Sequence, residues 1–501
     1  MANRLSPRES MYYFLDPTGA TSHLGALLIL DGDPRTEGMR GGSVSTDERP
    51  PSDNAATPTP NSTARSHHLD YPSLVSLVEN RLQLAPRYRQ IVRPVTMGLA
   101  RPVWADDPDF DINFHIRRSG LPRPGTMRDL ADLIARVMSR PLDRSRPLWE
   151  MYLIEGLSGD GYALLTKSHR CLVDDFAGPE ISQIIVDETA DVVEYEPDLW
   201  MPGQPPGSTA LAVGAIADAV TRPGEVIDSV ITSNGVIGGV RTVLDSTVRR
   251  VGSIIREMAD SAPQSPLTAH RSLSQTFAVT SVPRRECAKI AERHECTVND
   301  VVLAIISGVM RRWLLSFDVA AAITDTVRVE IPLATRDPGV SAEADRAATW
   351  IDVGTPGFVT DLPVGEDNPT VRLAQVAGLA DRYSQSSRRV TLGPRPILAE
   401  LGMVPFAEFS SWAFRSLGTR GYHVPMSITD SPVADRYVLG RKVTGLYSVP
   451  GLIDSHALSI GVVEYCDRLH IAFIADQGVI GDLPALADYV IESFDELVDA
   501  D

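Results

Sequence analysis

A histidine, an arginine and two aspartates lie close together in residues 167–178, which read Lys-Ser-His-Arg-Cys-Leu-Val-Asp-Asp-Phe-Ala-Gly. The neutral imidazole of His169 could remove a proton from a hydroxyl near pH 7, because the pKa of histidine lies close to that pH. The carboxylate of Asp174, a few residues later, could hold the loop in shape. One histidine and one aspartate do not establish catalysis, since a histidine at a strand end can also be a buried, hydrogen-bonded support for its loop.

Two short apolar runs, residues 149–154 and 162–166, lie directly before this stretch. Between them, residues 156–161 contain three glycines, a serine and an aspartate, which is typical of a turn. The pattern predicts a hairpin of two strands. The histidine stretch leaves the second strand and precedes a helix.

Elsewhere the chain alternates between helical and strand patterns. Apolar spacing and end signals predict helices over residues 74–81, 127–138, 283–294 and 483–497. Thr297 and Asp300 match a capping box, which begins a long apolar helix that ends near residue 315. Strands are predicted over residues 24–30, 275–279 and 327–333, a hairpin over 457–475, and a loop feeding a short strand over 104–115. The predicted fold class is α/β (α+β), with strands and helices mixed in both halves.

The length of 501 residues exceeds what one hydrophobic core supports. We predict an N-terminal half over residues 1–200, a helical linker region over 201–270 and a C-terminal half over 271–501. Residues 32–68 are rich in Gly, Pro, Ser and Thr and bury little apolar surface, so they are predicted to be a disordered insertion.

The formal net charge of −18 argues against nucleic acid as a general partner. The four cysteines are scattered without a CxxC pair, which favours a reducing cytosol and predicts no metal site. No apolar stretch reaches the ~20 residues that span a bilayer, and residues 1–6 do not start a signal peptide. We therefore expect a cytoplasmic protein that touches a membrane only peripherally, at the inner face.

Residues 169–175 resemble the HHxxxDG motif of coenzyme A-dependent acyltransferases, and the chain resembles the bacterial wax ester synthase/diacylglycerol acyltransferase family in particular. Four further segments carry the resemblance: residues 4–7 (Arg-Leu-Ser-Pro), 102–111 (Pro-Val-Trp-Ala-Asp-Asp-Pro-Asp-Phe-Asp), 141–150 (ending Pro-Leu-Trp-Glu) and 297–300 (Thr-Val-Asn-Asp). Apart from the insertion, the match covers nearly the whole chain. It implies two mixed-sheet domains with a tunnel between them.

The motif departs from the family at two positions. His169 aligns with the first histidine and Asp174 with the aspartate, but Arg170 replaces the second histidine and Asp175 the glycine. The resemblance implies that the second histidine is the general base, and arginine cannot take that role because it stays protonated. We hypothesise that Arg170 and Asp175 form an ion pair. His169 is then the remaining candidate base within the motif, although adjacent residues of an extended strand point to opposite sides.

Two residues outside the motif complete the predicted site. Asp174 is expected to pair with Arg336, whose alternative role is that of a surface arginine. Asn299 is expected to line the site near the domain junction, or simply to begin its helix.

The resemblance implies an O-acyltransferase that uses acyl-CoA as substrate and needs no cofactor. Diacylglycerol or a long-chain alcohol would accept the acyl group, at a membrane or lipid droplet surface, to give triacylglycerol or wax esters. Arg170 and Asp175 favour an alternative, a catalytically impaired relative that binds acyl lipid or acyl-CoA without turnover. A third reading is transfer to a different acceptor by a base supplied elsewhere in the chain.

Overall fold

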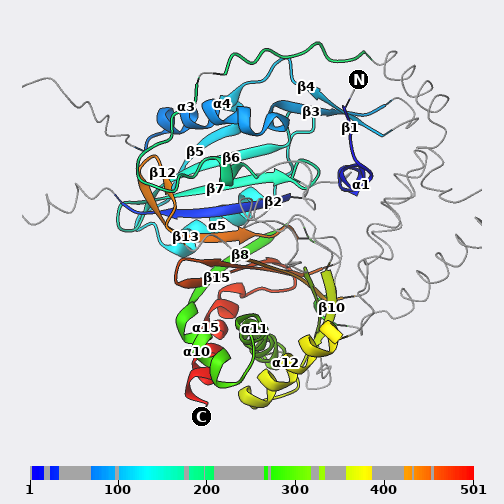
Figure 1. The fold of residues 1–501 in the computed structure, drawn as a ribbon, viewed down its shortest axis with the longest axis vertical. Coiled ribbons are helices and arrows are strands. Elements are labelled where there is room, and N and C mark those ends of the chain that lie inside the picture. Colours follow the sequence, from blue (N-terminus) through cyan, green and yellow to red (C-terminus); the bar gives the residue numbers. More distant parts are fainter. Residues whose placement is uncertain are drawn as a thin grey trace, which may run out of the picture.

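The computed structural model describes residues 3–15, 23–32, 69–95, 101–173, 180–196, 198–207, 265–268, 272, 274–316, 327–332, 357–385, 422–430, 434–452 and 456–500. Two six-stranded sheets and a three-stranded sheet form the framework of this part of the chain (Figure 1). The predicted disordered insertion and most of the predicted helical linker lie outside the described residues.

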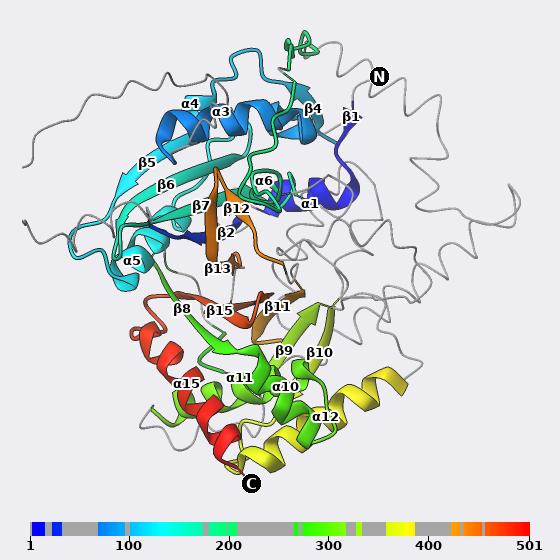
Figure 2. The same ribbon diagram turned by 60° about the vertical axis from the view of Figure 1, so that its left-hand side comes forward.

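The first six-stranded sheet carries the histidine stretch. Its order is β12 (Tyr437–Val438), β13 (Arg441–Val449), β2 (His23–Leu30), β7 (Gly161–His169), β6 (Trp149–Leu157) and β5 (Ile116–Gly120). Only β5 and β6 run parallel; the other neighbours are antiparallel. Helices α3 (Tyr71–Arg81) and α4 (Ile112–His115) cover one face (Figures 1 and 2). Two strands of this sheet therefore come from the C-terminal part of the chain.

The second six-stranded sheet is also mixed. Its order is β10 (Gly357–Leu362), β9 (Val327–Pro332), β11 (Val424–Asp430), β14 (Leu458–Tyr465), β15 (Arg468–Asp476) and β8 (Gln275–Pro283). Strand β11 runs parallel to both its neighbours. Helices α10 (Arg284–Arg293), α11 (Val298–Leu315), α12 (Pro369–Gln385) and α15 (Leu483–Asp499) gather beside it (Figure 2).

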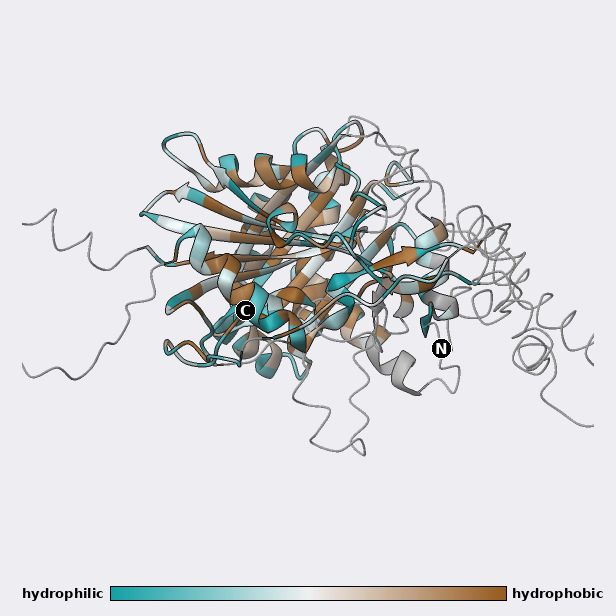
Figure 3. Cartoon of the chain, turned by 90° about the horizontal axis from the view of Figure 1, so that it is seen from above, coloured by the Kyte–Doolittle hydropathy of each residue, from teal (hydrophilic) through white to brown (hydrophobic). Residues whose placement is uncertain are grey.

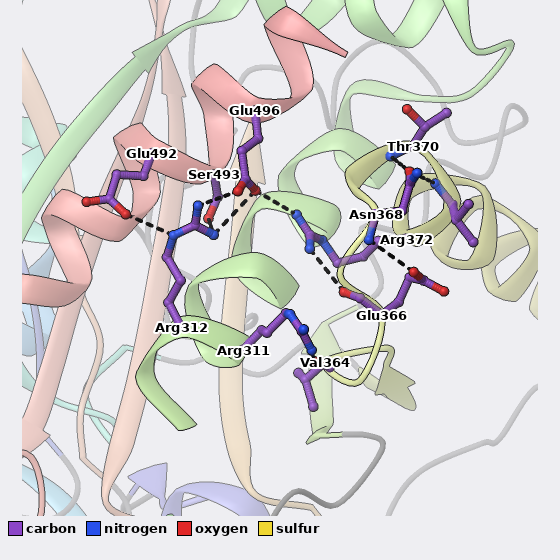
Figure 4. Close-up of polar contacts among 11 residues, drawn as sticks. Arg311, Arg312, Val364, Glu366, Asn368, Thr370, Arg372, Glu492, Ser493 and Glu496 are labelled. Atoms are coloured by element: carbon purple, nitrogen blue, oxygen red, sulfur yellow. Dashed lines mark hydrogen bonds and ion pairs between the residues drawn. The ribbon is translucent and has the colours of Figure 1, made fainter. Parts of the chain in front are cut away.

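A polar network links three of these helices (Figure 4). Arg372 of α12 is fully buried, and its guanidinium lies 3.4 Å from the Glu496 carboxylate of α15 and donates to the Glu366 carbonyl at 3.2 Å. Arg312 of α11 also bonds Glu496 and donates to Glu492 at 2.9 Å. Glu496 thus joins two arginines from different helices.

A three-stranded sheet of β1 (Asn3–Arg4), β4 (Val103–Asp106) and β3 (Gln90–Arg93) lies at the edge of the first half. The first half also contains α1 (Pro7–Leu15), the 3-10 helices η1 (Leu82–Leu84) and η2 (Pro86–Arg89), α5 (Met127–Met138) and the short α6 (Ile181–Ile184).

The two large sheets meet through α5 and a shared apolar cluster. This cluster joins Leu165 of β7 to Phe277 of β8 and Tyr447 of β13. At the end of α5, the Ser139 hydroxyl accepts a hydrogen bond from the Gln275 backbone at 3.3 Å. Figure 3 shows apolar residues, in brown, along the central strands, while hydrophilic residues, in teal, mark the outer loops. The side of β7 that bears Leu165 therefore faces the junction of the halves.

The predicted α/β fold class with two mixed sheets is confirmed. The predicted hairpins are β6–β7 and β14–β15, and the helix predicted over residues 127–138 is α5. The capping box of α11 is present, with Thr297 and Asp300 each accepting from the other's backbone N–H. The loop predicted over residues 104–115 was wrong at both ends: residues 104–106 belong to β4, and residues 112–115 are a helical turn begun by Asp111, whose side chain accepts from Asn113 N. The predicted boundaries of the halves and the tunnel between them stay predictions.

Candidate active site

His169 is the last residue of β7 and is held on several sides. It pairs in register with His23 of β2, its backbone N–H donates to Leu148 O at 3.0 Å, and its carbonyl accepts from Leu172 N at 2.9 Å. The last of these bonds closes a turn directly after the strand. The side chain is 1% exposed. The strand pairing and the turn therefore fix the backbone position from which the imidazole extends.

The backbone N–H of Cys171 donates to Nδ1 of His169 at 3.1 Å. Nδ1 must then carry a lone pair, so the neutral ring carries its proton on Nε2. In this arrangement His169 presents an N–H donor at Nε2. It would suit stabilisation of a developing negative charge better than removal of a proton.

Arg170 starts the turn, is half-buried, and places its guanidinium carbon 5.7 Å from the centroid of the Tyr12 ring. A cation over an aromatic face at this distance is weakly stabilised by the ring. Asp174, Asp175 and Arg336 lie outside the described residues, so the ion pairs predicted for them stay predictions.

Asn299 lies in the first turn of α11 and is exposed, whereas its neighbour Asp300 is buried as part of the capping box. Its predicted place in the site remains untested.

Lys167, two residues before His169, is a buried cation that sequence reasoning did not single out. Its Nζ donates to the Val137 carbonyl at 2.8 Å and to the Arg140 carbonyl. It therefore ties the motif strand to the end of α5, where carbonyls lack helical partners. A lysine within an apolar strand is the sequence signal that could have found this contact.

Glu180, beyond the motif, is a fully buried carboxylate that sequence reasoning also missed. It accepts from Ser168 Oγ at 3.3 Å, from Ser182 N at 2.7 Å and from Ser182 Oγ, and it caps helix α6. Burial raises its pKa, while the hydrogen bonds from Ser182 lower it. Because Ser168 directly precedes His169, this contact fastens the start of the motif loop to the helix after it. Beside it, Tyr88 OH accepts from Ile181 N at 2.9 Å.

His23, a second buried imidazole, lies beside His169. The ring centroids are 5.8 Å apart, and the rings meet edge to face at 71°. No local pattern in the sequence indicated this neighbour, because the contact depends on the pairing of β2 with β7.

Within the described ranges, no three or more His, Cys, Asp or Glu side chains are arranged to hold a metal ion. No helix in the same ranges is long and apolar enough to cross a bilayer.

The fold is shared with solved structures of two kinds of protein. A wax ester synthase/diacylglycerol acyltransferase from Marinobacter aquaeolei VT8 superimposes with a TM-score of 0.64 at 20% identity, covering 99% of this chain and 98% of that one. The first condensation domain of the calcium-dependent antibiotic synthetase superimposes with a TM-score of 0.51 at 16% identity, covering 100% and 98%.

Sequence comparison places the chain within one family. Residues 5–302 match the wax ester synthase/diacylglycerol acyltransferase catalytic domain, and residues 357–498 match the C-terminal domain of the same proteins. A protein of Mycobacterium tuberculosis named as a probable diacylglycerol O-acyltransferase, tgs3, is 38% identical over 300 residues, which cover 59% of this chain and 98% of that protein. A second, tgs1, is 28% identical over 433 residues, which cover 86% and 88%. The chain belongs to the wax ester synthase/diacylglycerol acyltransferase family.

Proposed function

We propose that this chain is a slow acyl-CoA-dependent O-acyltransferase, which forms triacylglycerol or wax esters from diacylglycerol or a long-chain alcohol. Membership of the family supports the reaction class. The observation that carries the proposed slowness is the pair of side chains at the end of β7: a guanidinium at position 170 and an N–H donor at position 169.

The reaction requires one proton transfer and one exchange at a carbonyl carbon. A base removes the proton of the acceptor hydroxyl, and the resulting alkoxide attacks the thioester carbonyl. The C–S bond then breaks, and the coenzyme A thiolate leaves and takes up the proton. The Nε2–H of His169 can stabilise the oxyanion formed on attack, a kind of contribution that commonly supplies about 3 kcal/mol. Arg170 stays protonated throughout and cannot serve as the base.

The alternative is a relative that binds acyl lipid or acyl-CoA without turnover, which the same two side chains favour. In either case we propose that contact with a membrane or lipid droplet is peripheral.

The two readings separate in an assay of purified protein with labelled palmitoyl-CoA and either diolein or hexadecanol. We expect slow ester formation, and faster ester formation in the Arg170→His/Asp175→Gly variant, because a histidine at the second motif position adds a general base there. Arg170→Gln removes the charge without adding a base, so it is the matched control and should gain little.

Rapid turnover by the unaltered chain that survives His169→Ala would contradict the assigned site. Tight binding of a non-reactive thioether analogue of palmitoyl-CoA without turnover of the thioester would select the non-catalytic reading.

A further inference from the structure

We propose that His23 is the general base of this chain and supplies, from β2, the imidazole that position 170 lacks; this rests on the acyltransferase function proposed above. His23 begins β2 and lies directly opposite His169 in the ladder. Both side chains are 1% exposed, and their ring centroids are 5.8 Å apart. The strand pairing thus brings two imidazoles together, one from each of two distant segments.

The two rings originate on the side of the sheet that faces the other half of the molecule. Side chains alternate along a strand, so His23 shares its face with Leu27, and His169 shares its face with Leu165. Both leucines belong to the cluster that includes Phe277 of the second sheet. Leu24 and Leu164, on the opposite face, pack in the core beneath α3 instead. Both imidazoles therefore leave the sheet toward the junction of the halves.

The Cys171 contact fixes the role of one ring, and the position of the other beside it suggests the complementary role. Nδ1 of His169 accepts the Cys171 N–H, which leaves Nε2–H as a donor. A base must present a ring nitrogen with a lone pair, and His23 is the imidazole beside that donor. Arg170 directs its guanidinium over Tyr12 and has no lone pair to offer.

The step balances without any further reactant. A ring nitrogen of His23 takes the proton from the acceptor hydroxyl while the oxygen attacks the thioester carbon, and His169 Nε2–H donates to the oxyanion. Collapse of the intermediate breaks the C–S bond. The His23 imidazolium then returns the proton to the leaving coenzyme A sulfur.

Epistasis distinguishes a base from a structural histidine. His23→Ala and His23→Gln are made in the unaltered chain and in the Arg170→His/Asp175→Gly variant, and kcat and KM for palmitoyl-CoA are measured in each. In the unaltered chain we expect kcat to fall about 100-fold or more with KM nearly constant, because the base contributes only to the chemical step. With histidine at position 170, the same substitutions should cost less than about tenfold, because a second base is then present.

Equal losses in the two backgrounds would show a structural role and overturn the proposal. So would a His23→Gln variant that keeps the rate, because glutamine can replace the hydrogen bonds of histidine but not its basicity. Turnover that survives His23→Ala overturns this inference alone. Absence of any turnover by the unaltered chain, with the thioether analogue still bound, overturns the proposed function and this inference together. Melting temperatures of all variants check that each one folds.

Discussion

Gly308 allows α11 to pack closely against α15, and replacing it tests that packing. A Cβ atom added at Gly308 would lie 2.7 Å from Ser493 Oγ, and 3.0 Å from both Ser493 Cβ and Arg372 Nη2. Arg372 is buried and bonded to Glu496, so it has little room to move. The helix interface must separate to accept even one methyl group.

Two opposing effects set the size of the change. Within a helix, alanine is favoured over glycine by about 1 kcal/mol. Overpacking of a filled interface costs about 1–3 kcal/mol, and loosening a buried arginine from its carboxylate adds to that cost. We expect Gly308→Ala to lower the free energy of unfolding by roughly 1–2 kcal/mol, or the melting temperature by about 1–4 °C.

Gly378 of α12 is the matched control, because an added Cβ there meets no described heavy atom within 4 Å outside the backbone of its own helix and its chain neighbours. Gly378→Ala should raise stability by about 0.5–1 kcal/mol through helix propensity alone. Adding Ser493→Gly to Gly308→Ala removes both Ser493 contacts and should restore part of the loss. Scanning calorimetry of the four proteins measures these shifts. If Gly308→Ala raises the melting temperature as Gly378→Ala does, the close approach of α11 and α15 is refuted.

Three further changes probe the motif strand and the second sheet. Gly25→Ala places a Cβ 2.0 Å from the backbone oxygen of Thr166, so β2 and β7 must separate; we expect a lower melting temperature and loss of ester formation. Burial lowers the pKa of His470 to about 4, so the unfolded chain binds a proton there that the folded chain does not. Stability should therefore fall as the pH drops from about 6.5 toward 4. In the His470→Phe variant, the melting temperature should depend less on pH over that range. Lys167→Met removes the Nζ donor from the carbonyl of Val137, in the last turn of α5, and from that of Arg140, just beyond the helix; this should cost about 1–3 kcal/mol and speed hydrogen exchange in the last turn of α5.

The sequence was sufficient to predict those elements whose structure depends on local patterns. The hairpin of β6 and β7, the apolar stripe of α5 and the capping box of Thr297 and Asp300 all depend on residues close together in the chain. The helical turn at residues 112–115 was missed because four residues are too few for a periodic pattern.

Contacts between distant segments could not be predicted in the same way. Strand β13 pairs with β2, so the C-terminal part of the chain completes the first sheet, and no short-range pattern marks that partner. The meeting of His23 with His169 and the contact of Ser168 with Glu180 likewise follow from strand pairing and loop closure. The motif alone indicated His169 as a candidate base, whereas the pairing of β2 with β7 places a second imidazole, that of His23, beside it.

The geometry also explains how arginine can occupy the second motif position while the fold is kept. His169 is buried, sits in a ladder, and accepts through its ring and its carbonyl from the turn that follows. A change there would disturb several contacts at once. Arg170 is half-buried and lies over one aromatic ring, so its side chain can vary at little cost to stability. The structure thus accommodates arginine at the second motif position, and the base proposed at His23, on the neighbouring strand, requires no change in the turn.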